Sequence, residues 1–360
     1  MSSIELAGIS KSWGDTTALH AISLRIADGS FCVLLGPSGC GKSTTLRIIA
    51  GLESATTGTV TIDGRDVTAQ APAQRGIAMV FQNYALFPHL TVADNITFGL
   101  SVRKLPKTEI AHRLHETADL LGLSALLARR PAQLSGGQQQ RVALGRALVA
   151  QAKVCLMDEP LSNLDAQLRQ DMRRELRELQ RRLSLTMVYV THDQTEAMSM
   201  ADQVLLLKQG RIEQAATPRT LYEEPASTFA ARFIGTPPMN LLHLQDGRIA
   251  GSDNPAPGGE ATATAAYLGL RPEAVRLIPP GAAHPAAGMT ATVRGSEYLG
   301  ADLVLHCAIG SETLTVRMNG NAQDHADTRV GSTVQLDWDA RDVHLFDADE
   351  RRIAQPSSLH

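Results

Sequence analysis

The chain has 360 residues, of which 43% are hydrophobic and 20% charged, a composition typical of globular rather than disordered or fibrous proteins. Its formal net charge of -3 offers no global positive field for a nucleic-acid backbone, so nucleic acid is not an expected partner. The cysteines lack the paired spacing of zinc sites or disulfides, and no apolar run approaches the roughly 18 residues of a membrane span, so we expect a cytosolic chain without its own pore.

The first part of the chain is predicted to be mainly β-structure. Polar and apolar residues alternate over Ser3 to Ile9 and Ala21 to Ile26, and the apolar run Phe31 to Leu35 is short enough for a buried strand. A glycine-rich segment follows, and apolar residues recur at helical spacing over Thr44 to Leu52. Residues 31–52 therefore predict a unit of strand, glycine-rich loop and helix.

The middle of the chain is predicted to combine a helical insert with buried strands. Residues from about 84 to 150 form this insert, in which Thr108 to Leu127 has helical spacing. Strands that alternate with helices imply a mainly parallel sheet. The elements predicted after the insert are strands over Lys153 to Met157, Thr186 to Val190 and Val204 to Lys208, and an amphipathic helix over Leu168 to Leu183.

The sequence changes character after Phe233. Prolines beginning at Pro237 punctuate short β-like runs, and residues 253–260 and 279–288 are predicted loops between strands. At roughly 150 residues per domain, the length predicts two or three domains. We expect a first domain over residues 1–235 and a β-rich second domain over residues 236–360.

A phosphate-binding loop is predicted directly after the strand at residues 31–35. Glycines allow the backbone amides to approach a phosphate, the lysine reaches the β- and γ-phosphates, and the final serine offers a hydroxyl to Mg²⁺. A glycine-rich turn with a chance lysine is the alternative, but the flanking strand and helix favour the phosphate loop. The residues are Gly36, Pro37, Ser38, Gly39, Cys40, Gly41, Lys42 and Ser43.

Two acidic residues end the strand predicted at residues 153–157. The carboxyl end of such a strand is where α/β sheets bind ligands, so Asp158 is placed to hold Mg²⁺ through water. Glu159 is placed to polarise or deprotonate an attacking water. A solvated strand end is the alternative interpretation.

A second candidate anion site lies at Leu134, Ser135, Gly136, Gly137 and Gln138, before a helical run over residues 139–149. Its serine hydroxyl, glycine amides and helix N-terminus suit an anion. One nucleotide does not need two such cradles, so the second would close over ATP held by another subunit. An N-capped helix after a turn is the alternative.

Together these motifs resemble the ATPases of ABC transporters. The sequences GPSGCGKS, FQNYALFPH, LSGGQ, VCLMDE, SNLD and VTHD occur in the family's order, and the resemblance covers about residues 3–235. It implies an α/β fold of the P-loop NTPase class with a helical subdomain at about residues 84–150. It also implies that ATP and Mg²⁺ are the cofactors and that the nucleotide-binding segment extends to Thr44.

The resemblance assigns roles to four further residues. Gln82 matches the glutamine that contacts Mg²⁺ and the lytic water, and His192 matches the switch histidine at the γ-phosphate. Asp165 matches an acid that communicates across the dimer, and Trp13 an aromatic that stacks on adenine. The respective alternatives are a polar loop residue, a structural histidine, a helix N-cap and a core tryptophan.

The sequence also suggests two surfaces that could contact a partner. The segment Tyr84 to His89 resembles the socket for a permease helix, with an insert that packs on itself as the alternative. The arginines of the 168–183 helix are expected to form a solvated face balanced by Glu175 and Glu178, with Glu178 and Arg182 at i,i+4 spacing, although such a stripe suits lipid headgroups or RNA as well.

The C-terminal region resembles the OB-like (TOBE-type) regulatory domain of importer ATPases for sugars and glycerol phosphate. The resemblance implies a homodimer on the cytoplasmic face of the inner membrane, two transmembrane permease subunits and, indirectly, a solute-binding protein. The expected cargo is a sugar or sugar phosphate such as sn-glycerol-3-phosphate or an oligosaccharide. Importers of polyamines or ferric iron, exporters, and ABC ATPases acting on DNA or ribosomes are the alternatives.

Overall fold

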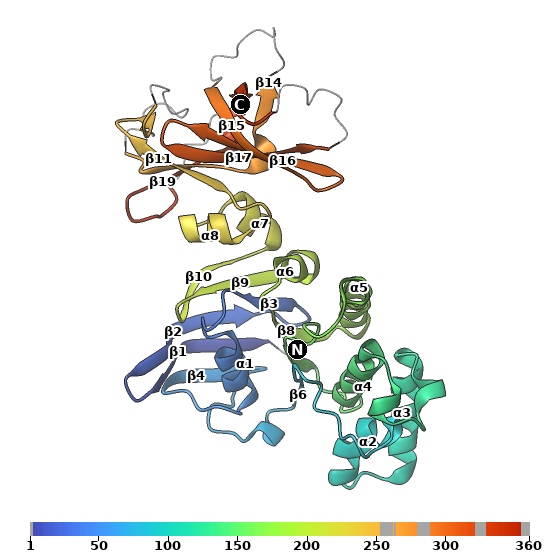
Figure 1. Cartoon of the computed structure of the whole chain (residues 1–360). Coiled ribbons are helices and arrows are strands. Elements are labelled where there is room, and N and C mark those ends of the chain that lie inside the picture. The colour runs from blue at the N-terminus through green and yellow to red at the C-terminus, as the bar shows by residue number, and fades with distance from the viewer. Residues whose placement is uncertain (1–2, 253–261, 263, 279–288, 321–328, 354–360) are drawn as a thin grey trace. The chain divides into compact units, whose positions relative to one another are not determined.

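The computed structural model describes residues 3–252, 262, 264–278, 289–320 and 329–353. The chain divides into two compact units, Met1–Arg219 and Thr220–His360 (Figure 1). The predicted loops at 253–260 and 279–288 lie outside the described residues.

A six-stranded sheet forms the centre of the first unit. Five of its strands run parallel, and the edge strand β10 pairs antiparallel with β9, which confirms the predicted mainly parallel sheet. Strands β3 and β8 are buried along their whole length, as a parallel sheet covered on both faces requires. In spatial order the strands are β10 (Arg211–Ala216), β9 (Gln203–Lys208), β3 (Phe31–Leu35), β8 (Thr186–Val190), β7 (Val154–Asp158) and β6 (Ile77–Val80).

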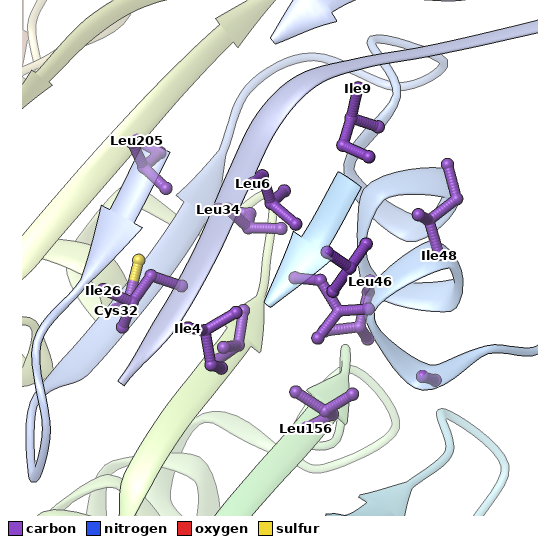
Figure 2. Packing of buried hydrophobic residues seen from close by; sticks show 14 of the residues in the cluster. Ile4, Leu6, Ile9, Ile26, Cys32, Leu34, Leu46, Ile48, Leu156 and Leu205 are labelled. Atoms are coloured by element: carbon purple, nitrogen blue, oxygen red, sulfur yellow. The ribbon is translucent and has the colours of Figure 1, made fainter. Parts of the chain in front are cut away.

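A second, antiparallel sheet contributes to the core of this unit. Figure 2 shows Ile4 and Leu6 of its strand β1 in the buried cluster that also contains Leu34 of β3 and Leu46 of the first helix. The helix that follows the glycine-rich loop is thereby held between two sheets. The strands are β2 (Thr16–Ile26), β1 (Ile4–Trp13), β4 (Thr57–Ile62) and β5 (Arg65–Asp66).

The predicted helical insert contains α2, α3 and α4. Close packing of α2 on α4 depends on Gly145, because a Cβ atom there would lie 3.2 Å from side-chain atoms of Ile96 and Leu121. Among the described helices, none is both long and apolar enough to cross a bilayer. The helices of the first unit are α1 (Lys42–Ala50), α2 (Val92–Val102), α3 (Lys107–Leu120), α4 (Gly136–Leu148), α5 (Ala166–Leu183) and α6 (Gln194–Met200).

The second unit is built from antiparallel sheets that enclose one main buried cluster, which includes Trp338. One sheet has the order β12 (Arg248–Ile249), β11 (Asn240–Gln245), β13 (Tyr267–Leu270) and β19 (Val343–Phe346). The other has the order β14 (Arg276–Ile278), β18 (Thr333–Asp337), β15 (Met289–Tyr298), β16 (Asp302–Ile309) and β17 (Glu312–Asn319).

The division between the units lies earlier in the chain than the expected boundary after residue 235. Helix α7 (Pro218–Glu223) begins at the division, and α8 (Thr228–Phe233) belongs to the second unit. The buried Arg271 explains this grouping: its guanidinium donates to the carbonyl of Tyr222 at 2.8 Å and to that of Ala231 at 3.1 Å. Both helices are thus tied to the β-rich unit by hydrogen bonds that the local sequence does not reveal.

Candidate functional site

The loop between β3 and α1 has a shape that only glycine permits at several positions. Gly36, Gly39 and Gly41 have φ angles of 152°, 77° and 103°. A Cβ atom on Gly36 would lie 2.4 Å from the carbonyl oxygen of Leu207, and one on Gly41 2.5 Å from a methyl carbon of Leu19. These contacts exclude larger residues, so the loop backbone stays open to an anion.

The ammonium group of Lys42 is buried inside this loop, with 6% of the residue exposed. Its Nζ donates to the carbonyls of Gly36 at 2.8 Å and Pro37 at 2.9 Å. Burial raises the pKa of the neighbouring Cys40 thiol, so that group is neutral and adds no competing charge. A positive charge at the N-terminus of α1, beside the exposed residues 37–39, suits a phosphate.

Ser43 and Asp158 meet across the sheet's carboxyl edge. The Ser43 hydroxyl donates to Oδ1 of the buried Asp158 at 2.8 Å. A hydroxyl and a carboxylate are hard oxygen ligands of the kind that Mg²⁺ accepts beside phosphate and water. Within the described part of the chain, no cluster of three histidine, cysteine or acidic side chains forms a complete metal site. The pair therefore fits a Mg²⁺ ion whose remaining ligands come from a nucleotide and water.

Glu159 and His192 lie together at the ends of the adjacent strands β7 and β8. His192 Nδ1 is 3.2 Å from Glu159 Oε2, and the histidine side chain is 60% exposed. Glu159 adopts a φ of 45°, an uncommon backbone conformation for a residue other than glycine. The carboxylate and the imidazole are thus close together at the end of β7, where Glu159 directly follows Asp158 in the chain, and a carboxylate in such a position can accept a proton from water.

The segment at residues 134–138 forms a capping box at the start of α4. The Ser135 hydroxyl accepts from the amide of Gln138 at 3.4 Å, and Gln138 Oε1 accepts from the amide of Ser135 at 3.0 Å. Gly137 packs against α5, since a Cβ atom there would lie 3.0 Å from the methyls of Leu168. Ser135 and Gly136 are exposed. Among the described contacts, no hydrogen bond or ion pair joins this segment to residues 36–44 of the same chain.

Gln82 contacts the loop that contains Asp165. The side-chain amide of Gln82 donates to the Ser162 hydroxyl at 3.5 Å, and the backbone carbonyl of Gln82 accepts from the side chain of Asn163 at 3.2 Å. Asp165 itself caps α5 by accepting from the amide of Leu168 at 3.0 Å, as its N-cap interpretation predicted. The cap leaves Asp165 exposed, so it does not prevent a contact with another subunit.

Trp13 lies on the surface, and its interpretation as a core residue is wrong. The residue is 48% exposed at the end of β1, because its side chain lies beyond the last buried position of that strand. Lys11 Nζ is 5.1 Å from the indole ring centre. The exposed indole leaves a flat apolar face for a base to stack on.

The segment at residues 84–89 is anchored on one side and exposed on the other. Arg146 donates to the backbone carbonyls of Ala85 at 2.6 Å and Tyr84 at 2.8 Å. The Phe87 ring is 4.5 Å from that of Phe98, which is itself 41% exposed. The segment therefore packs on the insert, as the alternative interpretation predicted, and its role as a socket for a permease helix stays a prediction.

The arginines of α5 are balanced by carboxylates other than those expected. Glu175 pairs with Arg141 of α4 at 2.6 Å, whereas Arg177 pairs with Asp202 and Arg174 pairs with Asp171 of the same helix. Among the ion pairs of the described residues, the expected Glu178 and Arg182 pair does not occur. The helix therefore forms a partly neutralised face whose carboxylate partners come from α5 itself, from the start of α6 and from the loop before β9.

Sequence reasoning missed three residues that surround the histidine. Thr191, Glu196 and Arg169 lie with Glu159, Ser162 and His192 around one small cavity. Thr191 and Glu196 are buried polar residues five positions apart, a signal that the sequence offers only once the strand and helix on either side are known.

Each of the two units contains a segment that matches a known protein family. The ABC transporter family profile matches residues 19–162, and the TOBE domain profile matches residues 268–346. The sn-glycerol-3-phosphate import ATP-binding protein UgpC of Brucella abortus is 49% identical over 98% of this chain and 100% of its own length. The protein of the same name from Cupriavidus necator is 47% identical over 97% of this chain and 98% of its own.

Two solved structures resemble about three-fifths of this chain. A Clostridium perfringens subunit of the cbiONQ ABC transporter complex superimposes with a TM-score of 0.57 at 28% identity, covering 61% of this chain and 90% of that one. An ATP-binding cassette whose structure is a dimer in a post-hydrolysis state, bound to ADP and Pi, gives a TM-score of 0.53 at 32% identity and covers 60% of this chain and 99% of its own.

Proposed function

Because this chain belongs to the ATP-hydrolysing subunits of ABC transporters, we propose that it energises the uptake of sn-glycerol-3-phosphate or a related sugar phosphate through a separate permease. The observation that carries the proposal is the similarity to import ATP-binding proteins along nearly the whole of both chains, including the TOBE-type second unit. A relative that shared only the ATPase unit would support ATP hydrolysis and leave the transported solute open.

The candidate site supplies each group that this reaction needs. Bound Mg·ATP would bring the γ-phosphoryl group and a divalent cation that offsets its charge. The loop from Gly36 to Thr44 would bind the phosphates, and Ser43, Asp158 and Gln82 would hold the metal. Trp13 would support the adenine. Glu159 would accept a proton from the attacking water while His192 contacts the γ-phosphate.

The segment Ser135, Gly136, Gly137 and Gln138 would complete the site of a second copy, with Asp165 beside it at the same interface. This segment forms the exposed N-terminal end of α4, and no described hydrogen bond joins it to the phosphate loop of the same chain. It is therefore available to a nucleotide that a second copy holds. The dimeric similar structure supports a homodimer. Two ATP molecules would then be held between matching copies, and their hydrolysis would reopen the pair.

Two transmembrane permease subunits are the proposed partners, with a solute-binding protein acting indirectly, at the cytoplasmic face of the inner membrane. The exposed aromatics near residues 84–89 are the proposed contact with the permease. A function on DNA or ribosomes is not favoured, because the similarity of the full chain is to import proteins and the α5 arginines Arg174 and Arg177 are paired with carboxylates.

Uptake by the host bacterium tests the proposal. Deletion of the gene for this chain should abolish the uptake of radiolabelled sn-glycerol-3-phosphate, and the wild-type gene should restore it. The Glu159→Gln gene serves as the matched control and should not restore uptake. Loss of polyamine or ferric iron uptake, with sn-glycerol-3-phosphate uptake unchanged, would overturn the proposed solute while leaving the ATPase assignment intact.

A further inference from the structure

A buried carboxylate lies directly behind the candidate catalytic histidine. Glu196, in the first turn of α6, is 3% exposed. Its Oε2 accepts hydrogen bonds from the hydroxyls of Tyr189 at 2.8 Å and Thr191 at 2.6 Å. A buried carboxylate without partners is strongly destabilising, so the two hydroxyl donors account for its retention inside the unit.

The Thr191 hydroxyl connects this carboxylate to the backbone on the far side of His192. It donates to Glu196 and accepts from the amide of Asp193 at 2.9 Å. Residues 191 and 193 flank His192, so the hydroxyl fixes the chain both before and after the histidine. Asp193 is also the N-cap of α6, accepting from the amide of Thr195 at 2.7 Å.

Asp193 is held from another direction by Arg169 of α5. Arg169 Nη1 lies 3.5 Å from Asp193 Oδ2, while its Nη2 donates to the carbonyl of Leu164 at 3.0 Å. The exposed imidazole of His192 therefore sits between two residues that are individually fixed. Among the described contacts, the imidazole of His192 forms a hydrogen bond with Glu159. The position of the imidazole therefore also depends on how Thr191 and Asp193 hold the backbone.

We infer that Glu196 is a positioning residue for ATP hydrolysis: through the Thr191 hydroxyl it holds the His192 imidazole against Glu159. The inference rests on the proposed catalytic role of these two residues. Glu196 does not touch the nucleotide in this account. A change at Glu196 should therefore affect the rate of hydrolysis rather than the binding of ATP. Displacing a catalytic group by about 1 Å costs on the order of 100-fold in rate.

Four variants of the full chain separate positioning from simple support of the fold. Thr191→Val keeps the volume but removes the hydroxyl next to the histidine, and Thr191→Ser restores it. Tyr189→Phe is the matched control, because it removes the other hydroxyl that binds the same oxygen, from within β8. Glu196→Leu keeps a side chain of similar size but removes the oxygen that accepts both hydrogen bonds. The readouts are kcat and KM for ATP, the equilibrium affinity for ATP, and the melting temperature.

Thr191→Val is expected to lower kcat about tenfold or more while ATP affinity stays within about twofold, and Thr191→Ser should recover kcat. Tyr189→Phe should lower the melting temperature without a comparable loss of kcat, and Glu196→Leu should lower kcat as Thr191→Val does. Equal losses of kcat in Thr191→Val and Tyr189→Phe, or an unchanged kcat in Thr191→Val, would overturn the inference. Absence of ATP hydrolysis by the wild-type chain would contradict the proposed function itself, and this inference with it.

Discussion

The Nδ1 atom of His192 lies 3.2 Å from the Oε2 atom of Glu159, at the ends of neighbouring parallel strands. If Glu159 is the general base, Glu159→Gln should lower steady-state ATP hydrolysis by about 10²- to 10⁴-fold, because the amide cannot accept the proton from water. The affinity for ATP should remain, since the phosphate loop is unchanged. Purified variant and wild-type chains can be compared by phosphate release and by equilibrium nucleotide binding. Undiminished steady-state hydrolysis in the variant would contradict the assignment.

Lys42→Ala should weaken ATP binding about tenfold or more, because a charge-assisted contact to the phosphates is lost. Lys153→Ala is the matched control: this lysine is exposed before β7, and its removal should leave affinity unchanged. Fluorescent nucleotide titration measures both. Wild-type affinity in Lys42→Ala would count against the assignment of the loop.

Gly36→Ala should destabilise the first unit by about 3 kcal/mol, since the new Cβ atom would meet the Leu207 carbonyl oxygen and the backbone would have to shift. Gly76 provides the control: its φ is 68°, but a Cβ atom there meets nothing within 4 Å. Gly76→Ala should therefore cost only about 1 kcal/mol, from backbone conformation alone. Urea unfolding of both variants measures the difference, and equal losses would show that the contact at Gly36 is relieved without cost.

The stability of the second unit should fall in mild acid because of His344. Burial, with the nearby charges of Arg352 and Arg271, lowers the pKa of this histidine from its ordinary 6.5 to about 4. The neutral form is favoured by folding, so its contribution is fully present above pH 6.5 and is lost as the pH falls towards 4. The loss reaches roughly 3 kcal/mol.

The fluorescence of the buried Trp338 reports unfolding of the second unit when the other tryptophan is removed by Trp13→Phe. His344→Leu should flatten the decline between pH 6.5 and 4. His112→Gln, at a side chain that is 65% exposed, should leave it unchanged. If the stability of the second unit fell equally in wild type and in His344→Leu, the loss of stability in acid would come from titratable groups other than His344.

Four strands of the central sheet, β3, β7, β8 and β9, were predicted because each is a short and mostly apolar run, whereas β6 and β10 were not predicted. Strands β3 and β8 have the predicted bounds. Helix starts were less accurate. Helix α4 begins at Gly136 rather than near residue 139, because the side chain of Ser135 caps it there, and α1 begins at Lys42, inside the phosphate loop.

The candidate site was predictable where a motif carries its own chemistry in consecutive residues, as at Gly36 to Ser43. Contacts between distant segments were not. Gln82 meets Ser162, Glu196 meets Tyr189 across the end of a strand, and Arg271 ties α7 and α8 to the second unit. These pairings depend on how strands and helices pack, which neither local propensity nor periodicity specifies.

The central claim is that ATP is enclosed between the phosphate loop of one copy and residues 135–138 of another. Light scattering of the Glu159→Gln chain with Mg·ATP tests it most directly, with Glu159→Gln/Gly136→Asp as its partner variant. We predict a dimer for the first, and for the second a monomer that still binds ATP, because an aspartate in place of Gly136 would repel the other copy's phosphates. A monomer of the first variant at saturating ATP, or a dimer that persists in the second, would contradict the account.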